Sequence, residues 1–252
     1  MFDFLFKGKR REALKATPLS AEQRATVHAN VPYVLTLSAE DQRELEGHIQ
    51  VFLAEKTFEG CAGLVLTDEI KLTIAAQACV LLLHRETDYY PGVESILVYP
   101  SAYVVKNVRQ NLGGVAVEGD QERVGESWVR GVVVLAWDAV TRGASNPHDG
   151  HNVVFHEFAH QLDAEGGASG FGERSSYIAW ARVLGTEYDE LVRRIAQHRR
   201  TDLDAYAATN PAEFFAVVTE VFFENGARLE RTHPELYEAL CEFYRQDPAV
   251  NG

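Results

Sequence analysis

Three residues in the chain have the types and spacing of a metal site. His156, Glu157 and His160 form the pattern H-E-x-x-H. Residues four apart on a helix share one face, with Cβ atoms about 5–6 Å apart, so both imidazoles can bind a single ion. Glu157 is rotated about 100° from His156, which leaves its carboxylate beside the ion, where it can accept a proton from water. The pattern therefore predicts a catalytic zinc site with Glu157 as general base.

The residues around this pattern predict a helix that is buried on nearly every side. Its apolar members are Val153, Val154, Phe155, Phe158, Ala159 and Leu162. Imidazoles in such surroundings need partners or a metal. Asp163 lies on the histidine face, where it can orient a ligand histidine through its other ring nitrogen or simply end the helix.

A third protein ligand is expected, because a catalytic zinc usually has three such ligands and one open position. The longer metzincin motif is excluded, since Asp163 and Gly166 occupy its glycine and last histidine positions. The ligand must therefore come from farther along the chain.

A predicted helix after Asn210-Pro211 offers candidates for this ligand. Glu213, Glu220 and Glu224 recur there at intervals of 7 and 4, on one face of an otherwise apolar helix. Glu213 can be the ligand or close an N-terminal capping box. Glu220 can be the ligand, an acceptor for an imidazole N–H, or a salt-bridge partner. The chemistry of the residues does not rank Glu213 and Glu220.

Three segments carry a resemblance to a known family. With H-E-F-A-H-Q-L-D at 156–163, N-P-A-E-F-F-A-V at 210–217 and F-Y-R-Q-D-P at 243–248, the chain resembles the Mlc titration factor A family of bacterial zinc metallopeptidases. These are gluzincin-like proteins. The resemblance implies a zincin-like fold similar to the catalytic domain of anthrax lethal factor.

The resemblance also implies a role for each site residue. It selects Glu213 over Glu220, so that His156, His160 and Glu213 would bind one Zn²⁺. Glu157 would be the catalytic base, assisted by Tyr206, which stands seven residues before Glu213. Glu220, like Asp163, remains a candidate for contacting a ligand histidine.

The function implied by the resemblance is hydrolysis of peptides, of the aminopeptidase type, in the cytosol. The family also binds the glucose repressor Mlc and so affects the sugar phosphotransferase system. The alternative is a non-catalytic protein-binding module that sequesters a transcriptional regulator, with a structural or switching zinc. Glu157 speaks against a purely structural site, because structural zinc usually has four protein ligands.

Composition limits the partners and the compartment. The chain has 252 residues and a net charge of −13, which argues against nucleic acid or an anionic membrane as partner. Cys61, Cys79 and Cys241 lack the spacing of a disulfide framework, and no apolar stretch approaches the roughly 20 residues of a membrane span. We therefore expect a cytoplasmic protein.

The elements predict an α+β fold in a single metallopeptidase unit over residues 1–252. A short basic arm (1–17) precedes helices capped by Ser20, Ser38 and Thr67, in a helical part that extends to about residue 90. Residues 91–165 are expected to hold the sheet and the H-E-x-x-H helix, and residues 166–252 a second helical part.

The central part predicts short strands and the last part long helices. The β-rich runs are 96–99, 102–105, 115–117, 127–129 and 132–137. They suggest a small, mainly antiparallel sheet, followed by a loop over Arg142–Gly150. The C-terminal helices are expected at about 174–199, 211–225 and 233–246.

Overall fold

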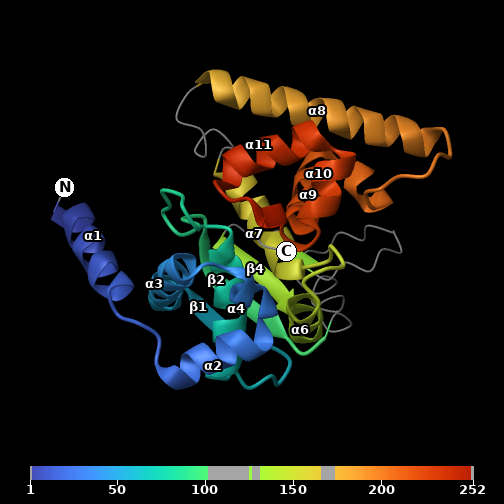
Figure 1. Cartoon of the computed structure of the whole chain (residues 1–252). Helices are drawn as coiled ribbons and strands as arrows, with labels where there is room; N and C mark the ends of the chain where they lie inside the picture. Colours follow the sequence, from blue (N-terminus) through green and yellow to red (C-terminus); the bar gives the residue numbers. More distant parts are fainter. Residues whose placement is uncertain (1, 102–124, 127–130, 166–173, 251–252) are drawn as a thin grey trace. The chain divides into compact units, whose positions relative to one another are not determined.

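The computed structural model describes residues 2–101, 125–126, 131–165 and 174–250. The chain divides into two units, one of Met1–Val80 and Val93–Ser145 and the other of Leu81–Gly92 and Asn146–Gly252 (Figure 1). The single metallopeptidase unit expected over the whole chain stays a prediction.

The first unit contains a small sheet of mixed direction. Its strands are β1 (Thr57–Gly60), β2 (Val93–Tyr99), β3 (Gly125–Glu126) and β4 (Gly131–Ala136). They lie in the order β1-β2-β4-β3, with β1, β2 and β4 parallel and β3 antiparallel to β4. In the register of the central pair, Ile96 faces Val133.

The prediction of a mainly antiparallel sheet is therefore wrong. Parallel strands need a long crossover, and helix α4 (Asp68–Val80) lies between β1 and β2 in the chain. The runs predicted at 96–99 and 132–137 fall within β2 and β4, except that Trp137 begins a helix. Those predicted at 102–105, 115–117 and 127–129 lie outside the described residues.

The first unit contains further helical elements besides α4. They are α1 (Phe2–Lys15), α2 (Ala21–Asn30), the 3₁₀ turn η1 (Pro32–Thr36), α3 (Ala39–Glu55) and α6 (Trp137–Ser145). The predicted caps are confirmed: Ser20 forms a capping box with Gln23, Ser38 accepts from Asp41 N, and Thr67 accepts from Ile70 N. Helix α4 is largely buried and contacts α2, α3 and α6.

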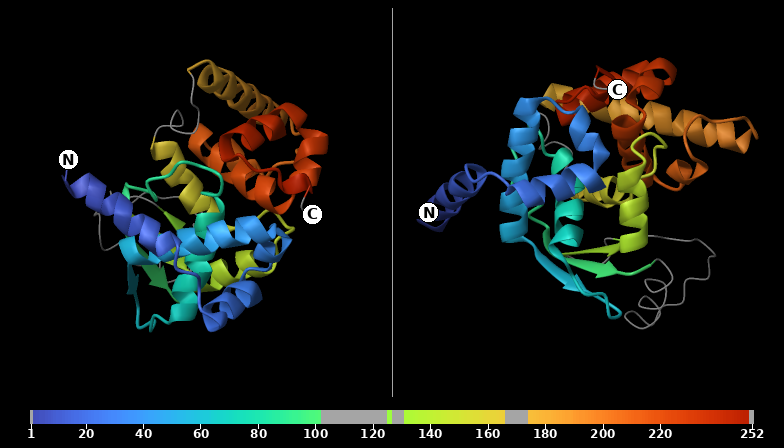
Figure 2. Two further views of the ribbon diagram at one scale, coloured as in Figure 1. Left: turned by 60° about the vertical axis from the view of Figure 1, so that its left-hand side comes forward. Right: turned by 60° about the horizontal axis from the view of Figure 1, so that its bottom comes forward.

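Two segments of this unit differ from expectation. The expected N-terminal arm forms α1, tied to α3 by Arg11 Nε and Glu55 Oε1 at 2.7 Å; Figure 2 shows it at the edge of the unit, with the N-terminus at its outer end. The expected loop over Arg142–Gly150 is helical as far as Ser145, in α6. Helix α6 was missed because Trp137 also fits the end of the preceding strand.

The second unit is helical. Its elements are α7 (Val153–Ala164), α8 (Arg174–Ala196), η3 (Ala205–Ala208), α9 (Pro211–Glu224), α10 (Gly226–Thr232), α11 (Pro234–Tyr244) and η4 (Pro248–Val250). The three expected C-terminal helices correspond to α8, α9 and α11, with prolines in the first turns of α9 and α11 as predicted. Helix α10 was not predicted.

Aromatic side chains fill the core of the second unit. Trp180 of α8 stacks on Phe243 of α11 with ring centroids 4.8 Å apart, consistent with α8 lying along α11 in Figure 1. Helix α7 packs along α9, where Phe155 meets Phe223 at 5.3 Å. The core therefore holds α7 and α9 side by side.

The cysteines are free, and the described helices are not of the membrane-spanning kind. Cys61, Cys79 and Cys241 are all among the described residues, and none is in a disulfide. Within the described part of the chain, every helix is too short or too polar to cross a bilayer.

Candidate metal centre

Helix α7 begins with a side-chain cap at Asn152. The Oδ1 atom of Asn152 accepts hydrogen bonds from Val154 N and Phe155 N, both at 3.1 Å. These are two of the N–H groups that the first turn of any helix leaves without a backbone partner. Within this helix His156 and His160 share one face, with ring centroids 4.8 Å apart.

Helix α9 brings Glu213 to the two histidines. Asn210 caps this helix by accepting from Glu213 N at 3.0 Å, while the carboxylate of Glu213 turns toward α7. Its Oε2 lies 3.0 Å from His156 Nε2 and 3.4 Å from His160 Nε2. The two Nε2 atoms are 3.2 Å apart. Two helices distant in sequence thus supply three donor atoms to one point.

The donor set fits a metal ion of the expected kind. Zinc bonds to imidazole nitrogen and carboxylate oxygen are about 2.0–2.2 Å long, so tetrahedral ligands lie roughly 3.3–3.5 Å from one another. The donor atoms of His156, His160 and Glu213 are separated by 3.0–3.4 Å. Three donors also leave a fourth position for a substrate or a water molecule. The geometry is therefore compatible with a catalytic type of site.

Glu220, which follows Glu213 along α9, contacts the other nitrogen of His156. Its Oε1 lies 2.7 Å from His156 Nδ1. With Nδ1 donating to a carboxylate, Nε2 is the nitrogen that faces the centre. Asp163, the other candidate for this kind of contact, is exposed, and among the described hydrogen bonds none joins it to His156 or His160.

The two residues expected to assist catalysis lie beside the same centre. Glu157 is only 3% exposed, and its charge contributes to raising the pKa of His156. Tyr206 belongs to η3, whose start is capped by Asp204 Oδ1 accepting from Tyr206 N at 2.7 Å. The Tyr206 ring centroid is 6.1 Å from that of His156.

The electrostatics of the centre favour positive charge. Burial lowers the pKa of His156, but hydrogen bonds to Glu213 and Glu220 outweigh this effect and raise it to about 10. Burial raises the pKa of Glu213, but His156 and His160 hold it well below its usual range. The carboxylates that stabilise a proton on His156 would stabilise a metal cation for the same reason.

Glu224 and Asn152 complete this arrangement, and sequence reasoning gave neither a role. Glu224 is 4% exposed and accepts from Gly150 N at 3.1 Å, His151 N at 3.0 Å and Asn152 Nδ2 at 3.0 Å. Glu220 Oε2 accepts from Asn152 N at 2.6 Å. An asparagine directly before an apolar helical run is a common N-cap, so this signal was present in the sequence.

Burial dominates the ionisation of Glu224. It raises the pKa of this carboxyl group to about 8, with smaller contributions in the same direction from Asp149 and Glu220. The N–H donors of Asn152 and His151 act in the opposite direction, because they stabilise the ionised form.

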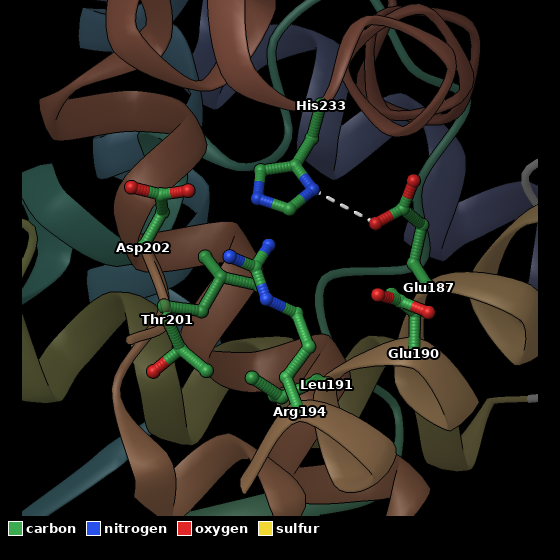
Figure 3. Close-up of a pocket in the computed structure, with 8 residues that line it drawn as sticks. Glu187, Glu190, Leu191, Arg194, Thr201, Asp202 and His233 are labelled. Carbon is green, nitrogen blue, oxygen red and sulfur yellow. Dashed lines mark hydrogen bonds and ion pairs between the residues drawn. The ribbon is translucent and has the colours of Figure 1, made fainter. Parts of the chain in front are cut away.

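A polar recess elsewhere in the second unit is not part of this centre (Figure 3). It is lined by Glu187, Glu190, Leu191, Arg194, Thr201, Asp202, Leu203 and His233. Its imidazole is already engaged, with His233 Nδ1 2.8 Å from Glu187 Oε2. None of the sequence-predicted site residues, all of which the structure describes, lines this recess.

The raised pKa of Glu224 predicts a pH-dependent stability. Its folded-state value of about 8 exceeds the ordinary 4.5, so the folded protein retains a proton that the unfolded chain releases between these pH values. The stability that Glu224 contributes in this way is fully present below the pKa of the unfolded chain and is lost as the pH rises through the pKa of the folded protein. Because Gln cannot titrate, the unfolding free energy of the wild type should fall relative to that of Glu224→Gln as the pH rises.

Urea unfolding from about pH 5 to about pH 9, with a chelator present to remove metal binding, measures this difference. We expect a change on the order of a few kcal/mol across the range. A difference between the two proteins that does not vary with pH would contradict the assignment.

Comparison with known proteins agrees with these observations. Residues 5–245 match the family model described as "Glucose-regulated metallo-peptidase M90". The chain is 42% identical to the uncharacterized protein slr2042 of Synechocystis over 247 residues, which cover 96% of this chain and 90% of the relative. It is 32% identical to Mlc titration factor A of Yersinia pestis and of Yersinia pseudotuberculosis over 242 residues, or 93% of this chain and 89% of each relative.

Both the extent of the family match and the identity to these relatives confirm the resemblance noted in the sequence. A metal ion, usually zinc, is characteristic of metallopeptidases, and the three converging donor atoms are suited to hold one. The chain belongs to the glucose-regulated metallopeptidase family M90.

Proposed function

We propose that the protein is a zinc-dependent metallopeptidase that hydrolyses peptide bonds, with an aminopeptidase type of specificity. His156, His160 and Glu213 hold one zinc ion, and Glu220 orients His156. The observation that carries the proposal is the approach of three donor atoms to within 3.0–3.4 Å of one another. The match to a metallopeptidase family over residues 5–245 supports it independently.

Glu157 and Tyr206, beside the metal centre, have separate roles in hydrolysis. A bound zinc ion supplies Lewis acidity, which polarises a peptide carbonyl and lowers the pKa of a water molecule. Glu157 accepts a proton from the attacking water and delivers it to the leaving amine. The Tyr206 hydroxyl stabilises the negative charge that develops on the carbonyl oxygen, a contribution of roughly 2.7–4 kcal/mol for such donors in other hydrolases.

Replacing Glu157 by Gln should separate metal binding from hydrolysis. The variant keeps the size of the side chain and all three metal ligands, but it cannot accept a proton. We expect normal zinc content and a rate of peptide hydrolysis lowered by roughly 10²–10⁴-fold. A panel of short peptides with free and blocked N-termini measures both the loss and the preference for free N-termini. Turnover equal to that of the wild type would exclude Glu157 as the base.

Replacing Glu213 and Glu220 one at a time should separate a ligand from the residue that orients a ligand. Glu213→Ala should lose zinc, whereas Glu220→Ala should retain it with an affinity weakened roughly 10–100-fold. Zinc content by mass spectrometry and titration by competition with a chelator measure these effects.

Glu187→Ala is the matched control for these two variants. It also removes a carboxylate paired with a histidine of the second unit, the 2.8 Å contact to His233, but leaves the metal centre intact. Its zinc affinity should equal that of the wild type. Full zinc retention in Glu213→Ala would refute the choice of Glu213 as ligand.

A second role is suggested by the relatives named Mlc titration factor A. We propose that the protein also binds a transcriptional repressor of the Mlc type and thereby regulates sugar phosphotransferase systems. Such a partner would be met in the cytoplasm, and three cysteines without disulfides support the proposal that the protein is cytoplasmic. The alternative function is that the protein binds the repressor and hydrolyses no peptide.

Repressor binding by the Glu157→Gln variant distinguishes these possibilities. We expect the variant to bind a purified Mlc-type repressor as the wild type does, since residue 157 is buried and only hydrolysis depends on it. Binding by both proteins with hydrolysis by neither would favour the non-catalytic module. Absence of binding by both would exclude the repressor as a partner.

A further inference from the structure

Helix α9 presents two buried carboxylates, one turn apart, to the start of α7. Glu220 and Glu224 are 7% and 4% exposed. Glu220 touches His156 directly through its Oε1 atom, at 2.7 Å from Nδ1. Glu224 lies farther from the histidines, and the proposed chemistry does not use it. A buried carboxylate is costly unless its oxygens receive hydrogen bonds, so its partners indicate its role.

Glu224 receives its hydrogen bonds from the three residues that lead into α7. One oxygen accepts from Gly150 N and His151 N, and the other accepts from Asn152 Nδ2 at 3.0 Å. The Oδ1 atom of the same Asn152 caps α7 by accepting from two backbone N–H groups. Glu224 thus fixes the side chain that fixes the first turn of α7.

Asn152 also connects Glu224 to the carboxylate that orients His156. Its backbone N–H donates to Glu220 Oε2 at 2.6 Å, while the other oxygen of Glu220 is bonded to His156. A change in the position of Asn152 therefore shifts both the backbone that carries His156 and the acceptor of its Nδ1–H. The chain of contacts runs from Glu224 through Asn152 and Glu220 to a proposed metal ligand.

The backbone at Gly150 is built for this contact. Its φ of +79° is unfavourable for residues with a Cβ atom, and a Cβ there would approach Val221 Cγ2 to 3.3 Å. The glycine lets the chain turn closely against α9, which directs its N–H to Glu224. The next N–H, of His151, is shared between Glu224 and Asp149 Oδ1, the latter at 2.9 Å.

We propose that Glu224 is a positioning residue of the metal centre, which acts through Asn152 and the backbone of residues 150–151 to hold His156 in its ligating orientation. This inference rests on the proposed function. It assigns to Glu224 no contact with substrate or metal. Its loss should lower metal affinity and turnover without removing a ligand.

The test exchanges the donor and acceptor roles of Asn152 and Glu224 by substitutions in the full-length protein. Glu224→Gln still accepts from Gly150 and His151, but its amide nitrogen faces the amide nitrogen of Asn152. Asn152→Asp still caps α7, but at about pH 9, above the pKa of Glu224, its second oxygen faces a carboxylate that has no proton to donate. When both substitutions are combined, the amide introduced at position 224 donates to the carboxylate introduced at position 152, so the hydrogen bond is restored with its direction reversed.

Zinc affinity, measured by competition with a chromogenic chelator, is the first readout. We expect each single variant to bind zinc about 10-fold more weakly and the double variant to recover most of this loss. The absorption spectrum of the cobalt(II)-substituted protein is the second readout, because it reports the ligand geometry directly. The single variants should alter the spectrum, and the double variant should resemble the wild type.

Tyr244→Phe is the matched control for loss of a buried hydrogen bond on α9. The Tyr244 hydroxyl lies 2.8 Å from Thr219 Oγ1, in a fully buried contact that involves no site residue. This variant should be less stable than the wild type, with unchanged zinc affinity and an unchanged cobalt spectrum. It therefore separates a general loss of stability from a loss of positioning.

Failure of the positioning role and failure of the proposed function give different results. If the wild type binds zinc and hydrolyses peptides while both single variants match it in affinity and spectrum, the positioning role is overturned and the proposed function stands. A double variant no better than the single variants would also overturn the positioning role. If the wild type binds no zinc, the proposed function fails and the inference fails with it.

Discussion

The arrangement of the second unit depends on the burial of two carboxyl groups on an apolar helix. Helix α9 is lined with phenylalanine, valine and alanine, yet it buries Glu220 and Glu224 almost completely. Such carboxylates require donors. The backbone N–H groups of residues 150–152, which lead into α7, and the side chains of Asn152 and His156 supply them. The contact that satisfies the carboxylates also sets the distance and register of α7 against α9.

The same register brings the donor atoms together. His156 and His160 come from α7 and Glu213 from α9, so the centre exists only when these two helices pack correctly. Aromatic contacts such as Phe155 with Phe223 hold the helices together but do not specify their register. The directional hydrogen bonds to Asn152 and His156 do so. In this view the hydrophobic core supplies the stability, and the polar contacts supply the geometry that metal chemistry requires.

Local patterns in the sequence predicted some of this arrangement and could not predict the rest. The H-E-x-x-H pattern and its apolar surroundings follow helical periodicity, so α7 was recognised from its residues alone. The choice of Glu213 over Glu220 came from family resemblance, because both lie on one face of α9 and only tertiary packing tells them apart. The role of Glu224 depends on residues more than 70 positions away, which no local pattern encodes.

The errors in the fold have similar causes. Short β-branched runs look alike in parallel and antiparallel sheets, and the crossover through α4 decides the direction of β1 and β2. Trp137 suits either the end of a strand or the start of a helix, and the residues that follow it form α6, which buries Ala139 and Val140. These outcomes depend on tertiary context.

The central claim is that two imidazoles and one carboxylate bind a single metal ion. Zinc K-edge X-ray absorption, recorded on protein loaded with one equivalent of zinc, tests it most directly. We predict nitrogen and oxygen neighbours at about 2.0–2.2 Å and the multiple-scattering signature of two histidines, whereas His160→Ala should retain no zinc. A first shell that contains sulfur, or full zinc loading of His160→Ala with the same two-histidine signature, would contradict it.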